Sequence, residues 1–124
     1  MELYIKAGDF LNILSEYYSD LLKEKVTVNS ECYYDYEGCW MNERKISKVR
    51  FDYTVETKIL NHTATKTIKL SKKEIQEAFT KLIDNYSVTN INFEVTEDDR
   101  CSFLSFIGVT LTLKEQQKKL GLEK

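Results

Sequence analysis

An alternation of apolar and polar residues between Val49 and Ile59, interrupted only at Thr57, limits the possible folds more than any other feature of this sequence. Alternation with a period of two is typical of a β-strand that has one buried face. After a turn at 60–63, Ile68 and Leu70 continue the apolar face. The two segments together therefore predict a β-hairpin.

Two other segments have helical spacing instead. Residues 9–23 carry apolar side chains at intervals of three and four, and Asp9 is a suitable N-cap. Ser71, followed three residues later by Glu74, forms a capping box that predicts a second helix ending near Tyr86. Shorter alternating runs predict further strands around residues 3–5, 25–32, 91–95 and 109–113.

This order of elements predicts an α+β fold, with a mostly antiparallel sheet of five to six strands and two helices packed on one face. The 124 residues include no proline and only four glycines, so we expect residues 1–124 to form a single domain without linkers. The segment 114–124 is highly charged and is expected to be a frayed tail. No internal repeat is visible in the sequence.

The net charge of −2 averages over blocks of opposite sign. Residues 1–41 contain eight acids and three bases, residues 42–81 five acids and ten bases, and residues 82–124 seven acids and five bases. Within the basic block, Arg44 to Arg50 and Lys66 to Lys73 alternate with apolar residues, as on a solvated sheet face. The alternative is a nucleic-acid-binding accessory protein that uses the basic 44–73 segment to contact phosphates.

The three cysteines invite a metal-site hypothesis. If consecutive strands are antiparallel, Cys32, Cys39 and Cys101 lie at the same end of the sheet and His62 lies at the other. Residues 33–46 have no helical period and are expected to form a polar, tyrosine-rich loop. Thiolates suit zinc, and a structural zinc ion would order this loop. Three unrelated thiols are an equally weighted alternative. The candidates for a fourth ligand are Asp98, Asp99, Asp35, Glu37 or a water molecule, with His62 only if this topology is wrong.

No feature of the sequence indicates an enzyme. The only histidine, His62, lies alone in the predicted turn, and no nucleophile motif, P-loop or HExxH pattern occurs. We therefore expect a non-enzymatic protein. No apolar run resembles a membrane span or a signal peptide, which predicts a cytoplasmic location.

An aromatic and acidic segment between Glu31 and Trp40 predicts a partner-binding site. Tyrosine and tryptophan dominate protein interfaces, and the interleaved acids favour a partner with a basic surface. Alternatively, some of these rings fold back onto the core. With the acids of the predicted turn at 96–100, the candidate residues are Tyr33, Tyr34, Asp35, Tyr36, Glu37, Trp40, Asp98 and Asp99.

The stretch SKKEIQEAFTKLIDNYSVTNINFEV, followed by FIGVTLTL, resembles the C-terminal half of small proteins carried by phages and mobile elements of Gram-positive bacteria. Some members of this group are anti-CRISPR proteins that act on type II effector nucleases. The resemblance implies a short, non-catalytic inhibitor found in the host cytoplasm that covers a surface of the nuclease. It does not include the cysteine-containing segment.

Overall fold

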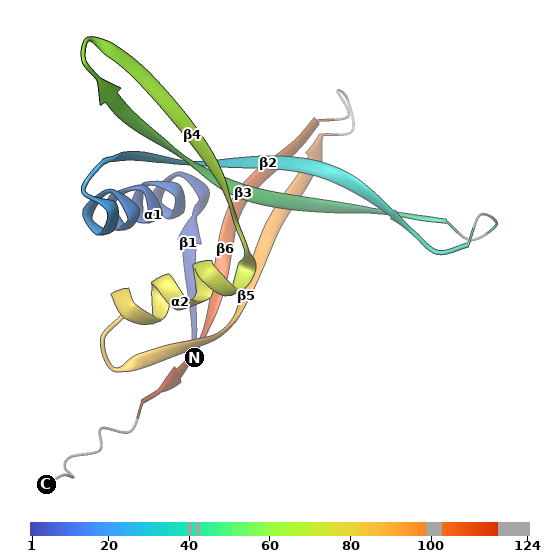
Figure 1. Ribbon diagram of the computed structural model, residues 1–124. Helices are drawn as coiled ribbons and strands as arrows, with labels where there is room; N and C mark the ends of the chain where they lie inside the picture. Colours follow the sequence, from blue (N-terminus) through green and yellow to red (C-terminus); the bar gives the residue numbers. More distant parts are fainter. Residues whose placement is uncertain (40, 42, 99–102, 117–124) are drawn as a thin grey trace, which may run out of the picture.

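The computed structural model describes residues 1–39, 41, 43–98 and 103–116. It contains two helices and six strands (Figure 1). Along the chain they are β1 (Glu2–Lys6), α1 (Ala7–Leu22), β2 (Lys25–Glu37), β3 (Arg44–Ile59), β4 (His62–Leu70), α2 (Lys72–Leu82), β5 (Tyr86–Asp98) and β6 (Phe103–Glu115).

The strands form two antiparallel sheets instead of the one sheet expected from the sequence. Sheet A has the order β1–β6–β5, and sheet B has the order β2–β3–β4. Both helices lie on the inner side of the two sheets, which meet at an angle (Figure 1). The α+β class, the antiparallel pairing and the number of strands are as predicted, but the strands are divided because β2 and β6 approach each other without forming a ladder.

The eight elements form two halves with the same order of strand, helix, strand and strand. The first half comprises β1, α1, β2 and β3, and the second comprises β4, α2, β5 and β6. The first strand of each half pairs with the last strand of the other, since β1 pairs with β6 and β4 pairs with β3. The two halves are therefore interlocked, and this repetition of topology was not visible in the sequence.

Apart from a one-residue shift in β5 after Val88, corresponding strands of the two halves also pair corresponding residues, which extends the repeat to individual residues. Lys23 lies three residues before Val26 of β2, and Asn85 lies three residues before Val88 of β5. Both residues have a positive φ, at 58° and 70°. The corresponding pairs are Leu3–Leu111 with Ile68–Tyr53, Ile5–Val109 with Leu70–Phe51, Val26–Val55 with Val88–Leu113, and Val28–Tyr53 with Ile91–Leu111.

The helices correspond in the same way. The same interval along the chain separates Leu14 from Ile75, Tyr18 from Phe79, and Ser19 from Thr80. The first four of these side chains are buried in the common core. Each helix thus presents an equivalent apolar face, as expected for amphipathic helices that cover a sheet.

Phe10 of α1 lies at the centre of five phenylalanines that join the two halves. Its side chain is fully buried, and its ring stacks on that of Phe79 from α2 with centroids 5.4 Å apart. Strand residues Phe51, Phe93 and Phe106 meet the Phe10 ring edge-on at 5.4, 6.1 and 5.7 Å. One residue therefore contacts α2 and both sheets.

Helix α1 caps the free edge of β2, the strand that follows it. The Ser19 hydroxyl accepts a hydrogen bond from the Val26 N–H at 3.0 Å and donates one to the Val26 carbonyl at 3.3 Å. The Ser15 hydroxyl accepts a hydrogen bond from the Val28 N–H at 2.9 Å. These side chains occupy backbone groups that would otherwise be open to another strand.

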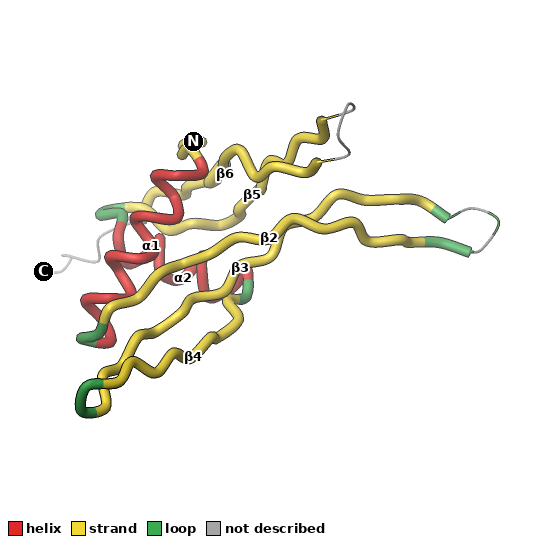
Figure 2. The backbone as a smooth tube through the Cα atoms, turned by 90° about the horizontal axis from the view of Figure 1, so that it is seen from above, coloured by secondary structure: helices red, strands yellow, loops and turns green. Residues whose placement is uncertain are grey.

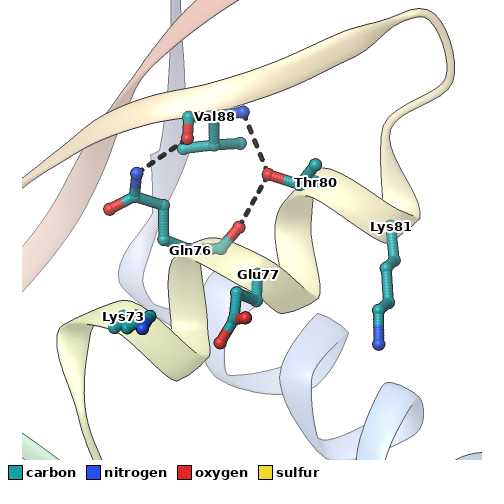
Figure 3. A pocket seen from close by; sticks show the side chains of 6 residues that line it. All are labelled: Lys73, Gln76, Glu77, Thr80, Lys81 and Val88. Atoms are coloured by element: carbon teal, nitrogen blue, oxygen red, sulfur yellow. Dashed lines mark hydrogen bonds between the residues drawn. The ribbon is translucent and has the colours of Figure 1, made fainter.

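Helix α2 caps β5 in the corresponding place, with the work divided between two residues (Figure 3). Thr80 accepts a hydrogen bond from the Val88 N–H at 3.0 Å, and the Gln76 amide donates to the Val88 carbonyl at 2.8 Å. Thr80 donates its own proton to the Gln76 carbonyl at 2.9 Å. The two halves therefore share the capping of a strand edge by the preceding helix, in addition to the same order of elements.

The predicted boundaries need three corrections. Helix α1 begins at Ala7, with Lys6 at the N-cap, so Asp9 lies in the first turn and is not the N-cap. The capping box is confirmed, because the Glu74 N–H donates to the Ser71 hydroxyl and the Ser71 N–H donates to the Glu74 carboxylate, each at 3.1 Å. Helix α2 ends at Leu82, however, and not near Tyr86. Strand β6 continues through Lys114 and Glu115, where the sequence predicted a tail, because both residues pair with the start of β5. The rest of that predicted tail, 117–124, lies outside the described residues.

Candidate protein-binding site

The segment predicted to be a polar loop is the far end of a long β-hairpin. Strand β2 runs through Glu37 and β3 begins at Arg44, with Glu31 to Glu37 paired against Arg50 to Arg44. Strand β4 covers β3 only from Phe51 onward, so this part has two strands. Figure 2 shows it continuing beyond β4 and the helices as a ribbon. We call residues 31–37 and 44–50 the arm.

The arm forms strands because its side chains alternate in character on both sides of the turn. Tyrosine favours the pleated backbone, and charges of opposite sign face each other across the ladder. Acids at 31, 35 and 37 lie opposite or diagonal to bases at 50, 48 and 44. The signal in the sequence is the matched spacing of acidic and basic residues on the two sides of the turn.

Ion pairs join the two strands on the outer face of the arm. The Lys48 ammonium lies 2.9 Å from the Asp35 carboxylate and 3.5 Å from that of Glu37. The Arg50 guanidinium donates to Glu31 at 2.6 Å. The hydrogen bond from Lys48 lowers the pKa of the Asp35 carboxyl, and the same contact raises the pKa of Lys48. The acids of the arm are thus largely compensated within the protein.

The inner face of the arm contacts the β5–β6 hairpin. The Tyr34 hydroxyl donates a hydrogen bond to the Glu97 carboxylate. The Lys45 ammonium lies 3.9 Å from the centroid of the Tyr34 ring and 3.9 Å from the Glu97 carboxylate. This cluster holds the arm in a defined direction, so Tyr34 has a structural role in addition to any role in binding.

The other predicted binding residues differ in their accessibility. Tyr36 is 58% exposed near the end of the arm, and its N–H donates to the Asp35 carboxylate at 3.0 Å. Tyr33 is half-buried on the outer face, with the Arg50 guanidinium 4.9 Å from its ring centroid. Trp40, the Asp98 side chain and Asp99 lie outside what the structure describes.

The structure separates two of the three cysteines proposed to bind zinc. Cys32 lies within β2 opposite Val49, whereas Cys39 follows the end of β2, at least five residues further along the strand. At ~3.3 Å per residue this is about 17 Å, too far to share one tetrahedral zinc ion. Burial also raises the pKa of the Cys32 thiol, which disfavours the thiolate.

Cys101, the third predicted ligand, lies outside the described residues, although Phe103 and Leu104 border a hollow of about 340 Å³ with Cys32. Within the described part of the chain, no group of three or more Cys, His, Asp or Glu side chains could hold a metal ion. His62 pairs with Ile59 at the other end of β3 from the arm, as the sequence predicted. A zinc site that joins all three cysteines therefore remains a prediction without geometric support.

The basic block divides into two parts with different environments. Among the bases of the Arg44–Arg50 part, Lys45, Lys48 and Arg50 form ion pairs. In the part from Lys58 to Lys73, no ion pair occurs among the described residues. A phosphate-binding stripe that includes the first part is thus disfavoured, since its charges are already compensated.

The hollow beside α2 offers no catalytic arrangement. It has a volume of about 410 Å³ and is bordered by Lys73, Glu77 and Lys81 from α2, with Gln76, Thr80 and Val88 forming the bonded group described above. In Figure 3 the side chains of Glu77 and Lys81 point away from Val88. The polar groups nearest β5 therefore serve to cap its edge.

Comparisons of the chain with protein-family models, curated proteins and solved structures give no match. Among the described residues, neither helix has the length and apolar character needed to cross a membrane.

Proposed function

We propose that this chain is a non-enzymatic protein-binding inhibitor that contacts its partner through the arm. The observation that carries this proposal is a two-stranded hairpin that extends beyond the body of the protein and bears an exposed tyrosine, Tyr36, near its end. A projecting ribbon adds little to the core, but it can reach a concave surface of a partner. Tyrosine side chains then supply rigid contact area at low entropic cost.

The charges of the arm refine the partner expected from the sequence. Between Glu31 and Arg50 the sequence has four acids and four bases, and three of the acids form ion pairs with Lys48 or Arg50 across the two strands. The arm is thus close to neutral, and its rings contribute more to recognition than its charges. A strongly basic partner surface is less favoured than the sequence indicated.

The most concrete form of this function is a phage-borne anti-CRISPR protein. Such a protein would act in the host cytoplasm, bind a type II CRISPR effector nuclease and block its work on DNA. The resemblance of the α2–β5–β6 region to small proteins of phages and mobile elements supports this form.

A pull-down with a type II nuclease–guide complex tests the proposal. We expect the wild-type chain to be captured, and Tyr36→Ala to weaken capture by about 2 kcal/mol, or roughly 30-fold, if Tyr36 is a hot spot. The same measurement on Trp40→Ala tests the tryptophan that the sequence predicts to bind. The matched control is Tyr4→Ala, which removes a 49% exposed tyrosine from sheet A.

The outcomes separate the arm from the rest of the surface. Equal capture of Tyr36→Ala, Trp40→Ala and wild type would remove the arm from the interface. Absence of capture of the wild-type chain would exclude the nuclease tested as the partner. Thermal melting of each variant ensures that a loss of capture reflects a lost contact and not unfolding.

A further inference from the structure

Strand β4 forms an open edge of sheet B. It pairs with β3 along all nine of its residues, from His62 opposite Ile59 to Leu70 opposite Phe51, without a register shift. Among the described strands, no other one pairs with its far side. In Figures 1 and 2, β4 is the outermost strand of its sheet, with no helix across its outer edge.

The capping bonds on β2 show which backbone groups of β4 face outward. The Val26 N–H points away from β3, toward Ser19, so Val26 and Val55 are a pair without mutual backbone hydrogen bonds. The backbone groups of Val55 then point toward β4, where its partner is Lys66. Alternate residues of β4 must therefore direct their N–H and C=O groups away from the sheet, namely Thr63, Thr65, Thr67 and Lys69.

The protein protects the edges of β2 and β5 but leaves β4 unprotected. Helix side chains bond the outward groups of Val26 and Val28 on β2, and those of Val88 on β5. Strand β5 also contains two register shifts, which discourage pairing with a further strand. Among the described residues, no side chain bonds the outward backbone groups of β4.

Strand β4 itself carries only positive charge, although Asp52 and Glu56 of β3 lie opposite Lys69 and Thr65. From position 57 to position 73 the sequence contains no acid. The five bases of this segment are exposed, and none has an ion pair with another described residue. They are Lys58 of β3, Lys66 and Lys69 of β4, and Lys72 and Lys73 of α2.

We propose that β4 binds an extended acidic segment of a partner protein, which adds to sheet B as a fourth strand. Open backbone groups supply hydrogen bonds to the added strand, and the lysines select for acidic side chains. A second copy of this chain is disfavoured, because antiparallel self-pairing would bring Lys66 and Lys69 of both copies together. Nucleic acid could use the lysines, but it would leave the outward N–H and C=O groups of β4 unpaired.

Fluorescence anisotropy with a labelled nine-residue peptide of alternating valine and glutamate tests this proposal. We expect binding by the full chain, and no binding of the same peptide with lysine in place of glutamate. Thr65→Pro removes one outward N–H without removing a bond to β3, and proline is tolerated at such an edge position. We expect this variant to bind the peptide at least tenfold more weakly, whereas Thr65→Ala, which keeps the N–H, should bind within about twofold of wild type.

Charge reversal provides an independent route if Thr65→Pro melts at a lower temperature. The double variant Lys66→Glu with Lys69→Glu should lose binding, whereas Lys114→Glu, an exposed lysine on sheet A, should not. Hydrogen exchange should show new protection at the amides of Thr63, Thr65 and Thr67 when the peptide is present. Tyr36→Ala should bind the peptide normally, so this test is independent of the arm.

Three results would overturn the proposal. The first is peptide affinity that is equal in Thr65→Pro and wild type, since strand addition requires the outward backbone groups. The second is tight binding of a twelve-nucleotide thymidine oligomer that Lys66→Glu abolishes and Thr65→Pro does not, which would indicate a phosphate-binding surface. The third is protection of the β4 amides that depends on protein concentration without peptide, which would indicate pairing between copies.

Discussion

The first half of the chain supplies Phe10 to the centre of the core, whereas the second half has the helix cap Ser71 at the corresponding position. When the two helices are aligned on corresponding residues such as Leu14 and Ile75, α1 begins about one turn before α2. That extra turn carries the ring that contacts four other phenylalanines. Two halves with equal topology therefore depend on one of them to fill the space between them.

A second difference lies in the hairpins that project from each half. The arm, in β2 and β3, is joined by ion pairs between its own strands. Among the described residues of the β5–β6 hairpin, no ion pair joins β5 to β6, and Glu97 instead contacts Lys45 of the arm. The two halves thus share the structural parts of the fold, while the ion pairs between strands lie on one hairpin. Exposed aromatic side chains occur on both hairpins, since Tyr36 is 58% and Phe103 of β6 is 68% exposed.

Phe10→Ala should have the largest effect on stability. Removing a fully buried phenylalanine ring that bridges both halves should lower the free energy of unfolding by about 3–5 kcal/mol. Urea denaturation measures this value, and both halves should unfold in one transition. Ser71→Ala, at the corresponding position, should cost only about 1 kcal/mol. Separate unfolding of the two halves in the Phe10 variant would contradict the role of this ring as their common centre.

The capping side chains should give the next largest effects. Ser19→Ala removes both hydrogen bonds to Val26, so we expect a loss of about 1–3 kcal/mol. Thr80→Val removes one of the two bonds to Val88, together with the bond from the Thr80 hydroxyl to the Gln76 carbonyl, which is a helix backbone group. Because Gln76 still caps the Val88 carbonyl, the change should cost about 1 kcal/mol. Hydrogen exchange at the Val26 and Val88 amides should accelerate in the respective variants. If both variants lost the same free energy of unfolding, dividing the capping of β5 between Gln76 and Thr80 would have no effect on stability.

The elements of the fold were predictable from the sequence, but their arrangement was not. Periodicity alone locates both helices and the Val49–Ile59 strand, because each buries one face. It does not show which strands pair, so it could not reveal that β1 crosses to β6 or that the strands form two sheets. The repeat is not visible in the sequence because the two halves share strand pairing and capping but not residue types. Ser19 and Thr80, for example, are different residues that cap equivalent strands.

The candidate site was predictable in composition but not in shape. The aromatic and acidic residues do lie together, yet the sequence indicated a loop, because Glu31 to Glu37 contain too little apolar alternation. Their strand structure depends on partners 11 to 19 residues away, such as Lys48 for Glu37 and Arg50 for Glu31. Periodicity compares residues only a few positions apart along one segment, so it cannot detect contacts of this kind.

Tyr18→Phe tests the comparison by making the first half resemble the second, which has Phe79 at the corresponding position. Burial, with a further contribution from the charge of Glu74, raises the pKa of Tyr18 to about 12. A folded-state pKa above the ordinary value of about 10 gives stability that is present below pH 10 and is lost as the pH rises toward 12. The wild-type free energy of unfolding should therefore fall more steeply over this range than that of Tyr18→Phe. Parallel curves would contradict the shifted pKa.

The smallest effect is expected for Lys48→Met, which alters the arm alone. Without the ammonium, the pKa of Asp35 should rise toward its ordinary value, as carbon-detected NMR titration of the carboxyl group can measure. Because the wild-type pKa is lowered, the interaction is present above the ordinary pKa and is lost as the pH falls through the folded-state pKa. The Tyr36 amide, which donates to Asp35, reports that loss directly.

The second hairpin provides the control for this measurement. No ion pair joins its described residues across β5 and β6, so amides such as that of Val95 should not follow the Asp35 titration in wild type or in Lys48→Met. The thermal melting point should change little, because both partners are exposed to solvent and screened. If the Val95 amide followed Asp35, the two hairpins would respond to pH as one unit, and the charge of the arm would not be a local property of the first half.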